Sequence, residues 1–197
     1  MIHELPLTEE TVHGYFSSAL PPVLSVDPGD SVRFQSLNAG WRWEPDAERF
    51  ERDRELHDGH ALNGPIEVRG ACAGQILVVT IDEVTPGSWG VTFGDGNPFQ
   101  WTLDGGTATD DRGVTVTLAP FLGVIGMPPP EPGVHSTAPP RRSGGNIDCQ
   151  LLVARRSISP FLWTARCSRP ATATPHRVTA KSRAPRSSAR SSARSSR

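Results

Sequence analysis

The stretch G-P-I-E-V-R-G-A-C-A-G-Q-I-L-V-V-T-I-D-E-V, from Gly64 to Val84, decides the fold class of this chain. It contains two short runs typical of β-strands, I-E-V-R-G-A and Q-I-L-V-V-T-I-D-E-V, with an A-G turn between them. The second run is apolar enough to be a central strand of a sheet. The stretch therefore predicts short strands joined by turns.

Short strands continue on both sides of this stretch. Val23 to Phe34 reads V-L-S-V, then the turn D-P-G-D, then S-V-R-F, which predicts a hairpin or a sheet corner. Trp89 to Phe93, Gln100 to Leu103 and Val114 to Leu118 are further strand candidates with Gly and Asp turns between them. Repeated short strands at this spacing predict a mainly β fold, a β-sandwich or barrel with little helix.

One segment departs from the strand pattern. Charged residues recur three and four positions apart between Trp41 and His60, which favours a helix. We expect a short, exposed helix that begins after Pro45 and ends near Gly59. It would be a solvated insertion between strands.

Charge divides the chain into two parts. Residues 151–197 hold 11 of the 20 Lys and Arg residues and none of the 21 Asp and Glu residues. The first 150 residues therefore carry a net charge of −12, which the near-neutral total hides. Ten serines in the basic part leave few apolar groups to offset the entropy of ordering. We expect a β domain at residues 1–154 and a disordered, Arg/Ser-rich tail at residues 155–197.

No apolar run approaches the roughly 18 residues that a membrane-spanning helix needs, and the start M-I-H-E-L-P-L-T-E-E lacks the order of a secretory signal. A cytoplasmic protein that does not contact a membrane is the expectation. Three cysteines without C-x-x-C spacing predict bystander thiols rather than a disulfide framework.

A second informative stretch, G-V-H-S-T-A-P-P-R-R-S-G-G-N-I-D from Gly133 to Asp148, places polar groups among glycines and prolines. On composition alone, the Pro/Gly-rich region from Pro128 to Gly145 is as consistent with a linker as with a rigid functional loop. Prolines restrict φ and glycines permit close backbone approach, so together they can hold side chains at a site without regular structure.

The polar groups of this stretch are of the kinds that hydrolytic sites use. Such a site needs an activated water or nucleophile, a hydrogen-bond donor that stabilises developing charge, and an acid for the leaving group. His135, Asn146 and Asp148 are the candidate catalytic residues, because they offer an imidazole, an amide and a carboxylate. Gly144 and Gly145 would let backbone N–H groups approach the substrate, and Thr137 would add a hydroxyl.

Four motifs together resemble the acetamidase/formamidase family. Besides the Gly133 to Asp148 stretch, V-D-P-G-D-S-V (Val26 to Val32), N-G-P-I-E-V-R-G-A (Asn63 to Ala71) and P-F-L-G-V-I-G (Pro120 to Gly126) occur in the family's order and approximate spacing. The resemblance implies hydrolysis of short linear amides such as formamide and acetamide. It also favours the rigid-loop interpretation over the linker.

The resemblance also implies a divalent metal, zinc or calcium, with His60 and Asp148 as candidate ligands. The pair His57 and His60 in H-D-G-H is by itself more typical of a surface loop than of a metal site. His60 is the better candidate, because the family places a histidine shortly before the G-P-I strand. The chain departs from the family at Asn38, where an aspartate is usual.

Family members continue past G-G-N-x-D with segments of the type L-P-V, G-A-L-F, G-D-x-H-A and G-D-G-E-V, which this chain lacks. With permissible GC-rich codons, an offset frame through Ile158 to Phe161 gives L-P-V, and the same offset through Arg169 to Pro175 gives A-G-D-G-H-A. We therefore expect a one-base insertion or deletion near Arg155 and Arg156, after which the chain is out of frame.

Three functions remain open at this level. The first is an amidohydrolase, a member of this family that is frame-shifted or truncated at its C-terminus, with a small amide as its substrate and self-association into a homo-oligomer. The second is an inactive fragment of such an enzyme. The third is a protein that binds nucleic acid or another polyanion through the basic tail, although the tail has no interleaved aromatic residues.

Overall fold

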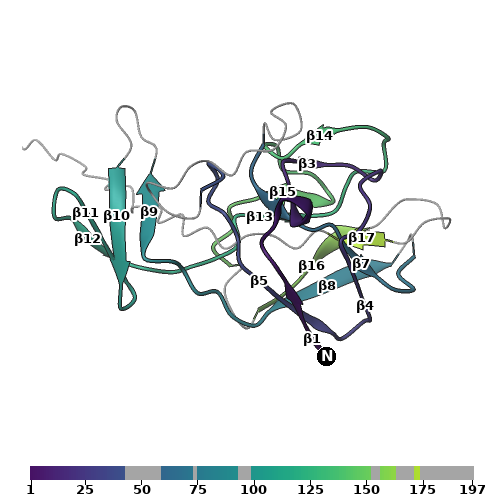
Figure 1. Ribbon diagram of the computed structural model, residues 1–197, viewed down its shortest axis with the longest axis horizontal. Coiled ribbons are helices and arrows are strands. Elements are labelled where there is room, and N and C mark those ends of the chain that lie inside the picture. Colours follow the sequence, from purple (N-terminus) through teal and green to yellow (C-terminus); the bar gives the residue numbers. More distant parts are fainter. Residues whose placement is uncertain (43–58, 73–74, 93–98, 152–155, 163–170, 174–197) are drawn as a thin grey trace, which may run out of the picture.

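The computed structural model describes residues 1–42, 59–72, 75–92, 99–151, 156–162 and 171–173, the last two ranges for their backbone only. Nearly all regular structure in these ranges is β, and the described helix is one 3-10 turn, η1 (Glu9–Thr11). The mainly β prediction is confirmed. The strands are β1 (Ile2–Leu5), β2 (Val12–His13), β3 (Tyr15–Phe16), β4 (Leu24–Val26), β5 (Ser31–Phe34), β6 (Leu62–Asn63), β7 (Ile66–Val68), β8 (Ile76–Ile81), β9 (Trp89–Thr92), β10 (Phe99–Asp104), β11 (Thr107–Asp110), β12 (Thr115–Thr117), β13 (Val124–Gly126), β14 (His135–Ser136), β15 (Gly144–Asn146), β16 (Arg156–Leu162) and β17 (Ala171–Ala173) (Figure 1).

The strands form several small sheets that join distant parts of the chain. β1 pairs with β5 in parallel, and β4 pairs with β7 in parallel. β4 and β5 therefore lie in different sheets, so the V-L-S-V-D-P-G-D-S-V-R-F segment is a sheet corner and not a hairpin. Its turn closes through a hydrogen bond from the Asp30 N–H to the Asp27 carbonyl, with Gly29 at a φ of 92°. Pro at the second turn position and Gly at the third are what a type II turn requires.

Strands β9 to β12 form a four-stranded antiparallel sheet at one end of the molecule (Figure 1). Gly105 and Gly106, both at positive φ, make the two-residue turn between β10 and β11. β11 was not predicted as a strand. Burial raises the pKa of the Asp110 carboxyl, but hydrogen bonds from Arg112 and Val114 outweigh this effect, so the pKa lies below its usual range.

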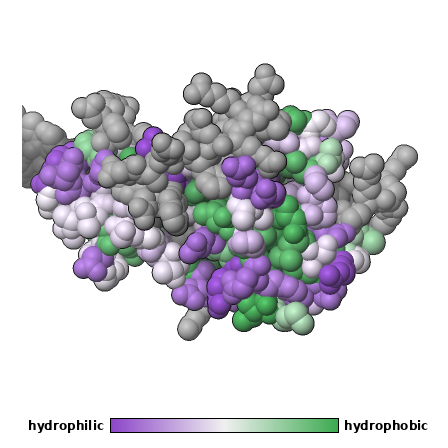
Figure 2. All heavy atoms as spheres, in the orientation of Figure 1, coloured by the Kyte–Doolittle hydropathy of each residue, from purple (hydrophilic) through white to green (hydrophobic). Residues whose placement is uncertain are grey.

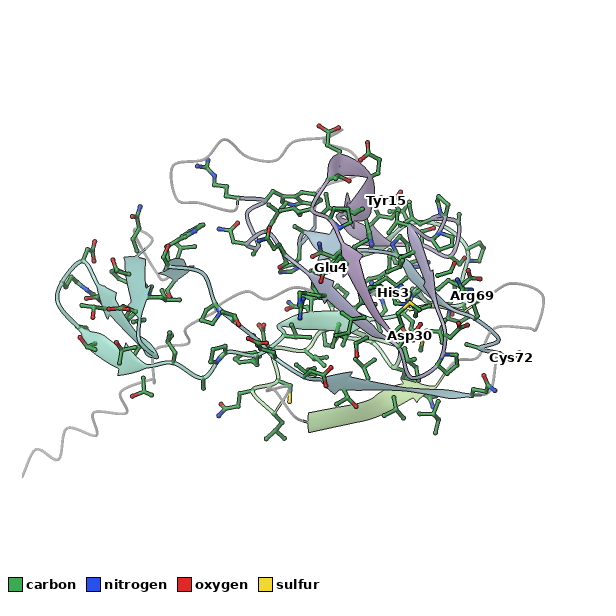
Figure 3. The ribbon with its side chains drawn as sticks, turned by 60° about the horizontal axis from the view of Figure 1, so that its bottom comes forward. His3, Glu4, Tyr15, Asp30, Arg69 and Cys72 are labelled. Carbon is green, nitrogen blue, oxygen red and sulfur yellow. The ribbon has the colours of Figure 1, made fainter. Side chains whose placement is uncertain are left out.

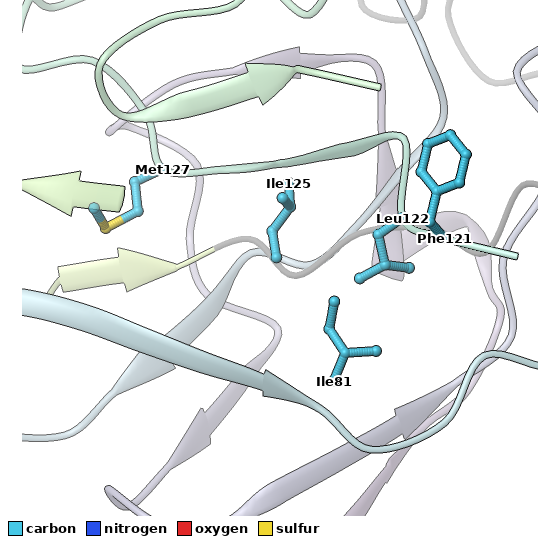
Figure 4. Close-up of a cluster of buried hydrophobic side chains, with 5 residues drawn as sticks. All are labelled: Ile81, Phe121, Leu122, Ile125 and Met127. Atoms are coloured by element: carbon cyan, nitrogen blue, oxygen red, sulfur yellow. The ribbon is translucent and has the colours of Figure 1, made fainter. Parts of the chain in front are cut away.

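Hydrophobic clusters of the described residues hold the sheets together. The largest packs Ile81 of β8 against a group of buried residues, Phe121, Leu122, Ile125 and Met127 (Figure 4). A second joins Leu5, Val26 and Ile66 from β1, β4 and β7. The chain from Pro120 to Met127 therefore runs along the inside of the fold and anchors the N-terminal side of the Pro/Gly-rich region.

The prediction that β8 is a central strand is wrong for the part of the chain that the structure describes. Its described partner is β16, on one edge. Ile76 and Val78 are 57 % and 56 % exposed, and the intervening Leu77 and Val79 pack against the largest cluster. In an apolar strand with one covered face, the exposure of successive side chains alternates in this way. Figure 2 shows apolar surface among hydrophilic surface on the face in view.

Two segments of residues 155–197 are described, and each pairs with a strand of the β domain. β16 pairs antiparallel with β8, and β17 pairs antiparallel with β7. The register of β16 shifts between Ile158 and Phe161, where Pro160 has no N–H to donate to the ladder. The free edges of β7 and β8 explain the pairing, since they present backbone groups that another strand can satisfy. Residues 163–170 and 174–197 lie outside the described residues, as does the expected helix after Pro45.

No helix in the described ranges is long and apolar enough to cross a membrane. Cys72 and Cys149 are free thiols. Both observations concern only those ranges.

Asp30, at the end of the corner turn, ties β1 to that turn (Figure 3). Its carboxylate accepts hydrogen bonds from the Met1 ammonium at 2.6 Å and bonds the His3 ring at 2.7 Å. The ammonium, followed by His3 and the Asp27 N–H, holds the pKa of the Asp30 carboxyl well below its usual range. The charged form of Asp30 is thus stabilised in the folded chain.

We expect Asp30→Asn to lower the free energy of unfolding at neutral pH, and to lower it more than Glu4→Gln, which breaks only the exposed Glu4–Arg33 pair. A folded-state pKa below the unfolded value of about 4 stabilises the fold above that pH, and the benefit is lost as the pH falls. Urea unfolding measures the free energy of unfolding of the wild type and both variants. The measurements run from about pH 3 to 7, on both sides of the unfolded pKa. The difference in the free energy of unfolding between wild type and Asp30→Asn should narrow toward the acid end of this range, and a difference independent of pH contradicts the assignment.

The pairing of β13 with β15 brings two glycine-rich backbones together. Ile125 lies opposite Gly145, and Gly126 lies opposite Gly144. A Cβ atom on Gly126 would lie 2.7 Å from the Gly145 nitrogen and 2.8 Å from the Ser143 carbonyl oxygen. These contacts are with backbone, which cannot rotate away.

We expect Gly126→Ala to destabilise the chain by about 1–3 kcal/mol, the usual cost of overpacking a tight contact. Gly87→Ala is the matched control, because a Cβ there meets nothing within 4 Å. Its effect should stay within about 0.5 kcal/mol. Thermal and urea unfolding of the two variants compare them directly, and equal stability would show that β13 and β15 are not in close contact.

Candidate active site

The Gly133 to Asp148 stretch is an anchored loop. β14 at its start pairs with β3, and β15 at its end pairs with β13. Its tip closes on itself, because the Arg141 N–H donates to the Gly144 carbonyl at 2.8 Å and the Gly144 N–H donates to the Arg141 carbonyl at 3.0 Å. The stretch is therefore a fixed loop and not a linker.

Gly144 and Gly145 have a structural role in this loop. Both have a positive φ, at 95° and 124°, a backbone conformation that residues with a side chain rarely adopt. A Cβ on Gly145 would lie 3.0 Å from the Pro139 carbonyl oxygen. The Gly144 N–H, expected to approach a substrate, is instead bonded to Arg141 within the loop.

His60 and Thr137 meet at the base of the loop. Thr137 is completely buried. Its Oγ1 accepts a hydrogen bond from the His60 backbone N–H at 2.8 Å and lies 2.9 Å from Nδ1 of the same imidazole. Gly59 makes this approach possible, because a Cβ there would overlap the Gly14 carbonyl oxygen and Thr137 Oγ1. The contact joins residues that are 77 positions apart.

Asn146 is tied to the same segment. Its side-chain Nδ2 donates to the Ala138 carbonyl at 3.1 Å. This bond fixes the orientation of the amide, since the reverse assignment would set two acceptor oxygens against each other. Asn146 Oδ1 is buried and has no hydrogen-bond partner among the described residues. It is an acceptor in need of a donor.

His135 and Asp148 point to other neighbours. The His135 ring bonds the Glu131 carbonyl through Nε2 at 2.9 Å. Asp148 has a φ of 39°, its N–H donates to the Gly123 carbonyl at 3.0 Å, and a Cβ on Gly123 would lie 2.9 Å from its Oδ1. The structure thus connects His60, Thr137 and Asn146 through the backbone of residues 137–138. Among the bonds between described residues, His135 and Asp148 join other neighbours.

The described residues do not fit a metal centre on their own. Within them, no three His, Cys, Asp or Glu side chains are grouped as metal ligands, and a structural or catalytic metal ordinarily takes at least three protein ligands. His60 and Asp148 therefore do not make the expected site with a third described residue. His57 lies outside the described residues.

Two residues near His60 were not singled out from the sequence. His13 of β2 is buried, lies opposite Leu62 of β6, and bonds the Tyr15 carbonyl through Nδ1 at 2.7 Å. Gly59 permits the contact with Thr137. No local signal marks either residue, because the roles of both come from strands and loops that meet only in the fold.

Comparison with known proteins agrees with this architecture. A formamidase of Methylophilus methylotrophus is 32% identical over 108 residues, which are 54% of this chain and 24% of that protein. The crystal structure of an acetamidase of Bacillus halodurans superposes with a TM-score of 0.73 at 19% identity, covering 89% of this chain and 62% of that one. A predicted acetamidase/formamidase of Thermoanaerobacter tengcongensis gives a TM-score of 0.73 at 22% identity, covering 91% and 62%.

The two crystal structures establish the fold. This chain spans about a quarter of the length of the Methylophilus formamidase and 62% of each crystal structure. The sequence model of the Acetamidase/Formamidase family matches residues 3–133, well over half of the chain. The chain therefore belongs to the acetamidase/formamidase family.

Proposed function

We propose that the function encoded in this chain is hydrolysis of the C–N bond of short linear amides, formamide or acetamide, to a carboxylate and ammonia. The family match over residues 3–133 carries this proposal. The 32% identity to a formamidase supports it. The Gly133 to Asp148 loop and His60 add polar groups that amide hydrolysis can use. His60, Thr137 and Asn146 are connected by hydrogen bonds, beside a backbone that glycine and proline hold in place.

Each polar group has a place in this proposal. Asn146 Oδ1, which is buried and has no hydrogen-bond partner among the described residues, suits the NH₂ group of a primary amide, which donates hydrogen bonds. An imidazole can donate to the carbonyl oxygen or move a proton between water and the leaving ammonia. His135 and Asp148 remain candidates for proton transfer and for orienting the attacking water.

A divalent cation, zinc or calcium, is a separate part of the proposal. If bound, it would polarise the carbonyl or activate a water. Asp148 is a candidate ligand, and at least one further ligand would have to come from residues outside the described ones. The roles of the polar side chains toward the amide do not depend on it.

We also propose that the reading frame is shifted near Arg155 and Arg156. The offset frame restores family-like segments of the types L-P-V and G-D-x-H-A. In this proposal, β16 and β17 occupy sheet edges that the in-frame segments would fill in an intact relative. The in-frame segments would also bring a histidine and acidic groups, which would complete the site.

Location and partners complete the proposal. We place the protein in the cytoplasm, acting on a small-molecule substrate. Self-association into a homo-oligomer through sheets is supported by the exposed Ile76 and Val78 of β8, because exposed apolar strands favour pairing with another chain.

Restoring the frame after Ala154 should produce ammonia release from formamide or acetamide that the chain as given lacks, because the site would then be complete. A coupled ammonia assay compares the two proteins, each without metal and with zinc or calcium added. Activity in neither form contradicts amide hydrolysis. Activity in both shows that residues 1–154 suffice, which contradicts the frame proposal.

Binding of polyanions is a second candidate function, supported by the charge of the tail. Residues 174–197 carry seven basic and no acidic residues. We expect retention on a heparin column that falls steeply with salt and is abolished by truncation after Ala173, which keeps β16 and β17. Unchanged retention of the truncated chain would exclude the tail as the binding segment.

A further inference from the structure

The contact between Thr137 and His60 restricts where protons can sit. A threonine hydroxyl has one proton to donate and two lone pairs that accept. Oγ1 of Thr137 has two partners in the described structure, the His60 backbone N–H at 2.8 Å and the ring Nδ1 at 2.9 Å. The side chain is completely buried, so water does not provide a third partner at the surface.

The backbone N–H can only donate, so it takes one lone pair of the hydroxyl. If Nδ1 also carried a proton, Oγ1 would accept twice, and the hydroxyl proton would have no acceptor among the described residues. A buried donor without a partner costs about 1–3 kcal/mol. If the hydroxyl donates to an unprotonated Nδ1, every group in the contact is satisfied. The second arrangement is therefore favoured.

We propose that Thr137 is a positioning residue that fixes His60 as the neutral tautomer with its proton on Nε2. His60 then serves as a hydrogen-bond donor to the amide carbonyl oxygen, and not as a metal ligand. This role rests on the proposed amide hydrolysis. The tautomer itself does not.

The same contact argues against His60 as a ligand through Nε2. A metal-bound imidazole almost always donates its other N–H to an acceptor. Here a proton on Nδ1 would leave the Thr137 hydroxyl proton without an acceptor among the described residues. The backbone cannot move away easily, because Gly59 is packed against the Gly14 carbonyl and Thr137 Oγ1.

His60 and Asn146 together supply one hydrogen-bond donor and one hydrogen-bond acceptor. A primary amide presents one carbonyl acceptor and an NH₂ donor. The Nε2–H of His60 would match the first, and the buried Oδ1 of Asn146 would match the second. Thr137 and Ala138 are adjacent in sequence and hold these two side chains through Oγ1 and a backbone carbonyl.

The test is long-range ¹H–¹⁵N NMR of the full chain labelled at histidine, at about pH 8, where an ordinary imidazole is neutral. The missing signals of His60→Gln assign His60. We expect Nδ1 unprotonated and Nε2 protonated in the wild type and in Thr137→Ser, and a mixture of tautomers in Thr137→Val. A protonated Nδ1 in the wild type overturns the proposal, as does a shift of the His60 signals when zinc is added. The wild-type and Thr137→Ser spectra decide the matter even if Thr137→Val does not fold.

A second readout separates this proposal from the proposed function. In the frame-restored protein, Thr137→Val should lower kcat on the order of 10- to 100-fold with a smaller change in KM, and Thr137→Ser should restore most of it. An unchanged kcat overturns the positioning role. If the tautomer is as expected and the restored wild type releases no ammonia, amide hydrolysis fails, and with it the role of His60 toward the substrate, while the assigned tautomer stands.

Discussion

One buried oxygen atom, Thr137 Oγ1, joins the two halves of the candidate site. It accepts the backbone N–H of His60 and contacts the His60 ring, across 77 residues of sequence. Thr137 comes directly after β14, which pairs with β3, and His60 precedes β6, which pairs with β2. The contact therefore depends on four strands from three regions of the chain. If it failed, His60 and the polar loop would have no described hydrogen bond in common.

Glycine makes this close approach possible. Gly59 lies where no Cβ fits, and Gly126 packs against the backbone of Gly144 and Gly145. At Gly59 the backbone lies against the Thr137 side chain, and at Gly126 the backbones of β13 and β15 lie against each other. The hydrophobic cluster of Ile81, Phe121, Leu122, Ile125 and Met127 includes a residue of β13, Ile125, and so supports that strand (Figure 4). Hydrophobic packing at β13 and backbone hydrogen bonds within the loop thus both hold the site in place.

Local chemistry made part of this predictable. The D-P-G-D turn was found because proline and glycine specify its dihedral angles, and the mainly β fold was inferred from repeated short strands. Which strands pair could not be read, because parallel partners such as β4 and β7 are set by contacts distant in sequence. For the same reason β8 was expected at the centre of a sheet, and the strands β16 and β17 were missed. The family motifs selected His60, Thr137 and Asn146, but only the fold shows which of the predicted polar residues are connected.

Amide hydrogen exchange at His60 tests the central claim most directly. If its N–H is bonded to a buried hydroxyl, it should exchange far more slowly than an exposed loop amide, at a rate close to that of the most protected strand amides. Exchange at the rate of an unstructured amide would contradict the contact. In that case the site would have no common support, and the roles assigned to Thr137 and His60 would fall together.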